Sequence, residues 1–224
     1  MTAIKLIETE DGSHSLYVRE MNETYHSTHG ALTESKHVFL KEGVSFWLMA
    51  NDPRHINILE VGFGTGLNAL MMLDFAKSNP ELTIDFFTLE PFPIGSDLYH
   101  QLNFASILNH VNREELLAMH ELGDEEKWDL DNFHFMKTMS KVEDTTFKEA
   151  YDVVFFDAFA PNKQAEVWGL DVLSKMYQAL KPGGILTTYC AQGQFKRNLA
   201  AAGFMLKTLE GPPGKKEMVR GTKE

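Results

Sequence analysis

Residues 56–66 read Ile-Asn-Ile-Leu-Glu-Val-Gly-Phe-Gly-Thr-Gly, a short apolar run that ends in three alternating glycines. Residues 67–78 follow with apolar side chains at helical spacing. Glycines allow a tight turn and let a ligand approach the backbone at the N-terminal end of a helix. The spacing differs from the dinucleotide pattern G-x-G-x-x-G, and the sequence has no G-x-x-x-x-G-K-S/T phosphate loop. The stretch therefore predicts a strand, a ligand-binding turn and a helix, and it argues against an NAD enzyme or an ATPase.

The chain after residue 66 continues to alternate between predicted helices and strands. Tyr151–Phe156 is almost entirely apolar, as expected for a parallel strand that is covered on both faces. Asp124–Asp131 is acidic and predicts a solvated loop. The alternation predicts a doubly wound, Rossmann-like α/β sheet. The other predicted strands are 82–89, 133–139 and 185–189, the helices are 95–108, 114–122, 167–180 and 194–202, and 204–209 with 217–221 form a closing antiparallel pair.

The first 52 residues have a different pattern and predict an N-terminal extension to a domain that spans residues 53–224. Ile4–Thr9 and Ser15–Val18 flank Asp11-Gly12, which indicates a β-hairpin. Residues 21–35 are polar and aromatic and predict a lid-like segment. Residues 36–50 predict a helix that ends before Pro53.

Composition excludes several classes of protein. The chain has 224 residues, 43% of them hydrophobic and 24% charged, which suits one globular domain. The single cysteine, Cys190, excludes an intrachain disulfide. No apolar run approaches the roughly 20 residues of a membrane span, and the N-terminus lacks a signal-peptide pattern. These features predict a cytoplasmic protein.

The formal net charge of −11 is unevenly distributed. Residues 1–195 carry 14 basic and 29 acidic side chains, whereas residues 196–224 carry 7 basic and 3 acidic ones. The overall acidity argues against a nucleic-acid partner, because phosphates attract basic surfaces. The basic segment leaves two interpretations open, a local anion-binding patch or a solvated tail.

Acidic residues follow three predicted strands, at the edge where ligands bind in open α/β sheets. Glu90 can accept hydrogen bonds from both hydroxyls of a ribose, or it is a surface carboxylate before a turn proline. Glu143 and Asp144 can contact an adenine amino group. Asp157 is a general base, a hydrogen-bond acceptor or the partner of a substrate cation, or else it caps the following turn.

Together these features fit a class I S-adenosylmethionine-dependent methyltransferase fold. Methyl transfer needs an unprotonated nucleophile and close positioning of donor and acceptor, but no metal. His26 and His29 lack a third ligand at a recognisable spacing, so we expect no metal site. The residues expected at S-adenosylmethionine are Glu60, Gly62, Phe63, Gly64, Thr65, Gly66, Glu90, Glu143, Asp144 and Asp157.

Two longer strings give a more specific indication. Asp157-Ala-Phe-Ala-Pro161 and Gly211-Pro-Pro-Gly-Lys-Lys-Glu-Met218 resemble segments of the MnmC methyltransferase domain family, and the similarity covers nearly the whole chain. The resemblance implies N-methylation of 5-aminomethyl-(2-thio)uridine at the tRNA wobble position, giving 5-methylaminomethyl-(2-thio)uridine. It also implies a stand-alone form without the FAD oxidase domain, for which a separate enzyme supplies the aminomethyl uridine.

The resemblance suggests roles for individual side chains. Asp157 would orient the acceptor amine and accept its proton, and Tyr25 and Glu34 would line the acceptor pocket. Phe159 would stack on a flipped uracil, or it is a core aromatic. The residues expected to bind phosphates of the anticodon stem-loop are Lys196, Arg197, Lys215, Lys216 and Arg220.

Two other functions remain open on the sequence. One is a class I methyltransferase that acts on another amine, in a small molecule or a protein. The other is a non-catalytic nucleoside-binding module.

Overall fold

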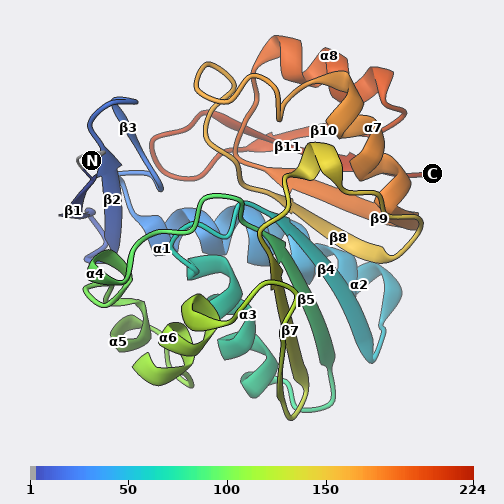
Figure 1. The fold of residues 1–224 in the computed structure, drawn as a ribbon. Coiled ribbons are helices and arrows are strands. Elements are labelled where there is room, and N and C mark those ends of the chain that lie inside the picture. The colour runs from blue at the N-terminus through green and yellow to red at the C-terminus, as the bar shows by residue number, and fades with distance from the viewer. Residues whose placement is uncertain (1–3) are drawn as a thin grey trace.

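An eight-stranded sheet forms the centre of the computed structural model, which describes residues 4–224. Its strand order is β10-β11-β9-β8-β4-β5-β7-β6, and the strands from β9 to β7 run parallel. The Rossmann-like α/β fold predicted above is confirmed (Figure 1). The strands are β4 (His55–Val61), β5 (Thr83–Leu89), β6 (Lys127–Leu130), β7 (Phe133–Thr138), β8 (Tyr151–Phe156), β9 (Leu180–Thr188), β10 (Met205–Glu210) and β11 (Glu217–Thr222).

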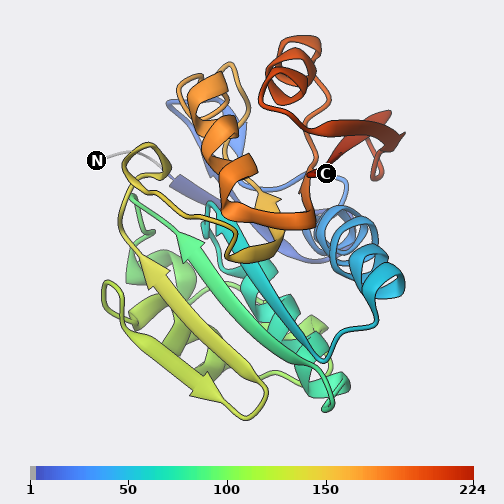
Figure 2. The same cartoon turned by 90° about the vertical axis from the view of Figure 1, so that its right-hand side faces the viewer.

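Helices cover both faces of this sheet (Figure 2). One apolar cluster joins the sheet to α3 (Leu67–Ser78), α5 (Phe104–Ile107) and α6 (Arg113–Glu121). A second cluster joins the opposite face to α7 (Leu170–Ala179) and α8 (Gly193–Ala201). Two further short elements are α4 (Ser96–Tyr99) and the 3-10 turn η2 (Val142–Asp144). Because β8 is covered on both sides, its almost wholly apolar sequence is fully accounted for.

The N-terminal residues form a small sheet of their own and one continuous helical segment. The sheet consists of β1 (Ile4–Glu8), β2 (His14–Val18) and β3 (Glu23–Thr24), so the predicted hairpin is present. The helical segment comprises α1 (Ala31–Ser35), the π-helix η1 (Lys36–Ser45) and α2 (Phe46–Asn51). It packs against β8 and β9, where Phe39 lies 4.9 Å from Phe155 between ring centroids.

The helical segment begins at Ala31, five residues before the predicted start. Its first N–H groups are bonded by the hairpin: the Ala31 N–H donates to Ser13 Oγ (3.1 Å), and the Thr33 N–H donates to Asp11 Oδ2 (2.8 Å). These partners lie about 20 residues upstream, so no local capping signal marks the helix start.

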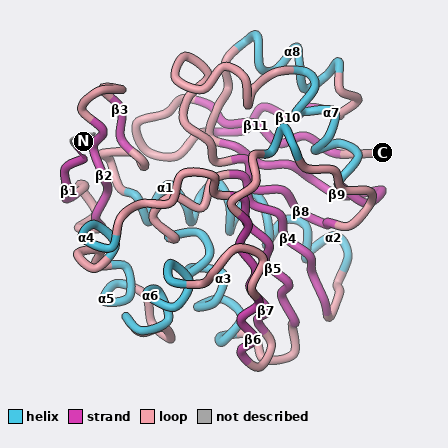
Figure 3. The backbone as a smooth tube through the Cα atoms, in the orientation of Figure 1, coloured by secondary structure: helices cyan, strands magenta, loops and turns pink. Residues whose placement is uncertain are grey.

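Three other predictions need correction (Figure 3). The acidic stretch 124–131 contains the edge strand β6, which pairs antiparallel with β7. The predicted helix 95–108 is two single turns, α4 and α5. Strand β9 begins at Leu180 and runs through Lys181–Gly184, with an irregular register opposite β8. The closing pair β10–β11 is antiparallel as predicted, and β11 also joins the main sheet through β9.

Among residues 4–224, no helix combines the length and the apolarity that a membrane crossing requires.

Candidate functional site

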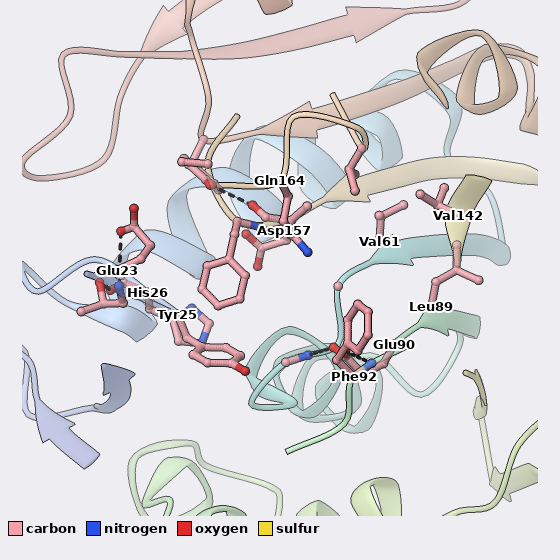
Figure 4. A pocket seen from close by; sticks show the side chains of 18 of the residues that line it. Glu23, Tyr25, His26, Val61, Leu89, Glu90, Phe92, Val142, Asp157 and Gln164 are labelled. Atoms are coloured by element: carbon pink, nitrogen blue, oxygen red, sulfur yellow. Dashed lines mark hydrogen bonds between the residues drawn. The ribbon is translucent and has the colours of Figure 1, made fainter. Parts of the chain in front are cut away.

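A cavity of about 440 Å³ opens at the carboxyl ends of β4, β5 and β8. Its wall is completed by the N-terminal segment 23–28, where Figure 4 labels Glu23, Tyr25 and His26. Lys215 from the β10–β11 loop also lines it. The edge predicted from the strand-end carboxylates is therefore the edge that holds the cavity. Glu90 and Asp157 both line it.

The glycine loop forms part of the wall with its backbone. Gly62, Gly64 and Gly66 all have positive φ, between 53° and 97°. A Cβ at Gly62 would lie 2.6 Å from the carbonyl oxygen of Asp157, so only glycine fits between the two strand ends. Gly62 and Gly64 line the cavity, whereas Gly66 does not.

Phe63 and Thr65 lie outside the cavity lining, and their expected contact with the cofactor stays a prediction. Phe63 is buried against His120, with 4.9 Å between ring centroids. The Thr65 hydroxyl bonds to His26 Nε2 (2.6 Å), and the Thr65 carbonyl oxygen lies 3.1 Å from His120 Nε2. The contacts of Phe63 and Thr65 with His26 and His120 hold the glycine loop in place.

Glu90 occupies one end of the cavity. Its Oε2 accepts the Gly64 N–H (2.7 Å) and its Oε1 accepts the Phe92 N–H (2.9 Å). Burial raises the pKa of this carboxyl group, against the two N–H donors. Apolar side chains lie beside it, and Figure 4 shows Val61, Leu89 and Val142 in this region.

Of the two acidic residues that follow β7, only one reaches the cavity. Glu143 lines it next to Val142, whereas Asp144 is exposed and lies outside the lining. The cavity lining gives no support to the predicted contact of Asp144 with a cofactor, which stays a prediction.

Asp157 lies near the middle of the cavity wall, at the end of β8. Its Oδ2 accepts a hydrogen bond from Asn68 Nδ2 (2.8 Å). Burial raises the pKa of Asp157 to about 7, and the negative charge of Glu34 acts in the same direction. A carboxyl group with this pKa exchanges a proton readily near neutral pH, as a general base must.

Aromatic and charged side chains surround the end of the cavity nearer the N-terminal segment. The rings of Tyr25 and Phe159 meet edge to face, 4.8 Å apart. Burial raises the pKa of Tyr25 to about 12, so its hydroxyl is neutral at physiological pH. Lys215 pairs with the buried carboxylate of Glu34, and its ammonium lies 3.9 Å from the centre of the Tyr189 ring. Phe159 lines the cavity and is not among the buried core residues.

The five basic residues expected at phosphates do not form one surface. Lys215 faces the cavity, and Arg220 is only 4% exposed and pairs with Glu42. A phosphate contact needs an accessible cation, which the buried Arg220 does not offer. The Lys215 side chain is 32% exposed, and its expected phosphate contact stays a prediction. Lys196 is half-buried and pairs with Glu217 (2.9 Å), while Arg197 and Lys216 are exposed.

Glu60 does not reach the cavity either. It is fully buried behind the glycine loop, and the Thr88 hydroxyl donates to its Oε2 (2.7 Å). The expected contact between Glu60 and a cofactor finds no support in the cavity lining and stays a prediction.

Several residues of the site escaped the sequence analysis. Asn68 holds Asp157, and Gln164 accepts the Phe159 N–H (3.0 Å) and lines the cavity. His26 lies at the cavity wall, and its only signal was a histidine pair considered for a metal. Asn68 carries no spacing signal, because its partner Asp157 is 89 residues away in the sequence. Gln164 bonds within its own loop, to Phe159 five residues earlier, and no known motif marks that pair. Among the described residues, no three His, Cys, Asp or Glu side chains gather in a way that could hold a metal ion.

The arrangement fits a nucleoside cofactor. The glycine loop has no side chains at positions where a Cβ would project into close contact with its neighbours. At Gly64, a Cβ would lie 3.0 Å from the Tyr25 ring. Glu90 supplies a carboxylate for ribose hydroxyls, and the apolar side chains beside it suit a base.

Comparison with known proteins agrees with this geometry. A family model described as S-adenosyl-L-methionine-dependent methyltransferase matches residues 106–224, more than half of the chain. Two relatives are bifunctional proteins MnmC of tRNA 5-methylaminomethyl-2-thiouridine biosynthesis. The one from Leptospira interrogans is 28% identical over 212 residues, and the one from Vibrio vulnificus is 30% identical over 227 residues. The matches cover 91% and 92% of this chain but only 33% of each relative, so the chain spans about a third of their length.

Two solved structures share the fold. The crystal structure of MNMC2 from Aquifex aeolicus is 25% identical, with a TM-score of 0.77, and the match covers 99% of this chain and 70% of that one. Spermidine synthase from Thermotoga maritima has a TM-score of 0.61 at 12% identity, over 100% of this chain and 70% of that one. At this identity the second match concerns the fold alone.

Proposed function

We propose that this chain, which belongs to the S-adenosyl-L-methionine-dependent methyltransferase family, methylates the primary amine of 5-aminomethyl-(2-thio)uridine at the wobble position of tRNA. The product would be 5-methylaminomethyl-(2-thio)uridine. Support for this acceptor comes from the names of the relatives and from the residues of the cavity. The observation that carries the proposal is the position of Asp157, between the nucleoside end of the cavity and the Tyr25–Phe159 pair.

The residues that would hold S-adenosyl-L-methionine are the backbone of Gly62 and Gly64 and the side chains of Glu90, Glu143 and Val142. When bound, the cofactor supplies an electrophilic methyl group. The remaining steps belong to the protein, which must bind the acceptor next to that methyl group and exclude water.

The acceptor amine is protonated in water at neutral pH and cannot act as a nucleophile in that form. Asp157 would accept a hydrogen bond from the amine and take its proton, which a carboxyl group with a pKa of about 7 can do and then release. Phe159 would stack on the uracil ring, with Tyr25 fixing the Phe159 ring from its edge. Glu34 and Lys215 close the cavity on the acceptor side.

The anticodon stem-loop would lie over the cavity, near the exposed cations Arg197 and Lys216 and the half-buried Lys196. We place the reaction in the cytoplasm, together with its tRNA. A methyl-transfer site does not produce the amine it consumes, so a separate catalytic activity would have to supply the aminomethyl group.

The test is methyl transfer by Asp157→Ala and Asp157→Asn to tRNA that carries the aminomethyl uridine, with nucleoside mass spectrometry as the readout. We expect both variants to lose about 100-fold or more in turnover, because general-base catalysis contributes about that factor. Calorimetry with S-adenosylhomocysteine checks that the cofactor site is intact. Near-normal turnover in both variants would show that Asp157 has another role. Faster transfer to free amines or proteins than to tRNA would identify a different acceptor.

A further inference from the structure

A buried row of polar side chains leads from the centre of the sheet to Asp157. The Thr88 hydroxyl on β5 donates to Oε2 of Glu60 on β4 (2.7 Å). Asn68, in the first turn of α3, donates from Nδ2 to Oδ2 of Asp157 (2.8 Å). Thr88, Glu60 and Asn68 are all at most 3% exposed. Only Asp157 lies at the cavity, so the other three act on a bound molecule only through it.

Two atoms of this row have no hydrogen-bond partner among the described residues. They are Oε1 of Glu60 and Oδ1 of Asn68, both completely buried. The Asn68 side chain lies against the Glu60 carboxyl group. An ionised carboxylate has only acceptors, as does an amide oxygen, so ionised Glu60 leaves both atoms unpaired. A carboxylic acid with its proton on Oε1 can donate to Oδ1 of Asn68, and one hydrogen bond then satisfies both atoms.

We propose that Glu60 carries a proton at neutral pH and is a positioning residue, whose O–H donates to Asn68 Oδ1 and so keeps the Asn68 N–H directed at Asp157. The inference rests on the proposed function, because it assumes that Asp157 acts on the acceptor amine. It assigns Glu60 a task different from the cofactor contact expected from its place before the glycine loop.

The charges around Glu60 favour its neutral form. The titratable groups that face it are Asp157 at the end of β8 and Glu90 at the end of β5, and both are acidic. Burial raises the pKa of Glu60 to about 8, the two neighbouring carboxylates add to this effect, and the hydrogen bond from Thr88 and the adjacent amide of Asn68 oppose it. A neutral Glu60 leaves the negative charge to Asp157, the group that meets the amine.

Fixing the amide group has a chemical consequence. An amide can present either its N–H or its oxygen to a neighbour by rotating through a half turn. With the N–H directed at Asp157, the hydrogen bond stabilises the ionised carboxylate that the amine requires. With the oxygen directed at Asp157, the carboxylate is disfavoured and its pKa rises. Glu60 in its acid form has a donor for the oxygen and therefore selects the first orientation.

The experiment compares Glu60→Gln and Glu60→Ala in methyl transfer to aminomethyl tRNA. A glutamine amide can donate to Asn68 Oδ1 and accept from Thr88, as the acid does, whereas alanine can do neither. We expect Glu60→Ala to lose about tenfold in kcat, with the acidic limb of the pH profile displaced to higher pH, since one hydrogen bond is worth about that factor. Glu60→Gln should recover most of this loss. Exposed Glu81→Gln is the matched control for removal of a carboxylate.

A second readout follows the proton itself in the unliganded native chain. Carbon-13 NMR of the glutamate carboxyl groups, with the Glu60 signal assigned by its absence from Glu60→Gln, should show a neutral acid at pH 7. A Glu60 signal that is ionised at pH 6 would overturn the inference, and so would a Glu60→Gln enzyme as slow as Glu60→Ala. Normal turnover in Asp157→Asn would instead contradict the proposed function, and the NMR titration would still decide the protonation of Glu60.

Discussion

A single methyl group added at Gly62 tests how closely the glycine loop approaches the end of β8. Gly62 has a φ of 97°, and a Cβ there would lie 2.6 Å from the Asp157 carbonyl oxygen and 3.2 Å from its carbon. Gly183 has a similar φ of 78°, but nothing lies within 4 Å of its Cβ position. Gly62→Ala and Gly183→Ala therefore share the strain of a positive φ and differ in the clash with the Asp157 backbone.

The structure sets the size of the difference. A left-handed conformation costs an alanine about 1–2 kcal/mol, and this is the whole effect expected at Gly183. At Gly62 the two backbones must also separate by at least about 0.4 Å to bring the contact to 3.0 Å. The hydrogen bonds from the Asp157 N–H to the Val61 oxygen and from the Gly62 N–H to the Leu89 oxygen, both 3.0 Å, resist this movement. Overpacking of this kind costs about 1–3 kcal/mol, so we expect Gly62→Ala to lose about 2–5 kcal/mol in total.

Urea unfolding of the two variants measures these losses, and calorimetry with S-adenosylhomocysteine measures the effect on the cofactor site. We expect Gly62→Ala to bind S-adenosylhomocysteine at least about tenfold more weakly, since the strand ends that carry Gly62 and Asp157 move apart. Gly183→Ala should bind normally. Equal destabilisation of the two variants, with equal affinities, would refute the argument from close approach.

Three further predictions concern other parts of the site. Burial holds the pKa of His26 at about 4, below its ordinary 6.5, so the native state loses stability as the pH falls from 6.5 towards 4. The stability advantage of wild type over His26→Gln should therefore shrink by about 2 kcal/mol between pH 7.5 and 5. A difference in stability that stays constant with pH would contradict this. Lys215→Met leaves the buried carboxylate of Glu34 without its cation and should lower the free energy of unfolding by about 1–3 kcal/mol, measured in denaturant. The additional change Glu34→Gln should restore most of this loss, whereas strictly additive losses would show that the pair does not interact. Lys216→Ala and Arg197→Ala should each lower the salt dependence of tRNA binding by about one in the slope of log K against log salt, and unchanged slopes would place the tRNA elsewhere.

Strong local patterns were sufficient to predict the elements that build the site. The apolar spacing after Gly66 predicts α3 at Leu67–Ser78, the range that the structure has. The run Tyr151–Phe156 predicts β8 to the residue, because a strand buried on both faces leaves little ambiguity. Glu90 follows β5 and Asp157 follows β8, and since parallel strands end at one edge of the sheet, the two predicted strand ends already place both residues at that edge.

The side-chain partners could not be predicted, because they are separated by long stretches of chain. Lys215 reads as a surface cation until Glu34, 181 residues away, is placed beside it. Arg220 lies in the basic segment of the sequence, but the pairing of β11 with β9 turns its guanidinium inward to Glu42. Asn68 carries no signal of its own, and its role appears only when α3 and β8 meet at the cavity. Tertiary contacts decide each of these cases.

Methylation of the aminomethyl group of a tRNA wobble uridine in this cavity can be measured as a newly formed nucleoside. The most direct measurement supplies the purified protein with S-adenosyl-L-methionine and two tRNA preparations, one carrying 5-aminomethyl-(2-thio)uridine and one lacking it, and quantifies nucleosides by mass spectrometry. We expect the methylaminomethyl nucleoside to form in the first tRNA, and no new methylated nucleoside to form in the second. Cofactor binding without any methylated nucleoside in the aminomethyl tRNA would contradict this expectation.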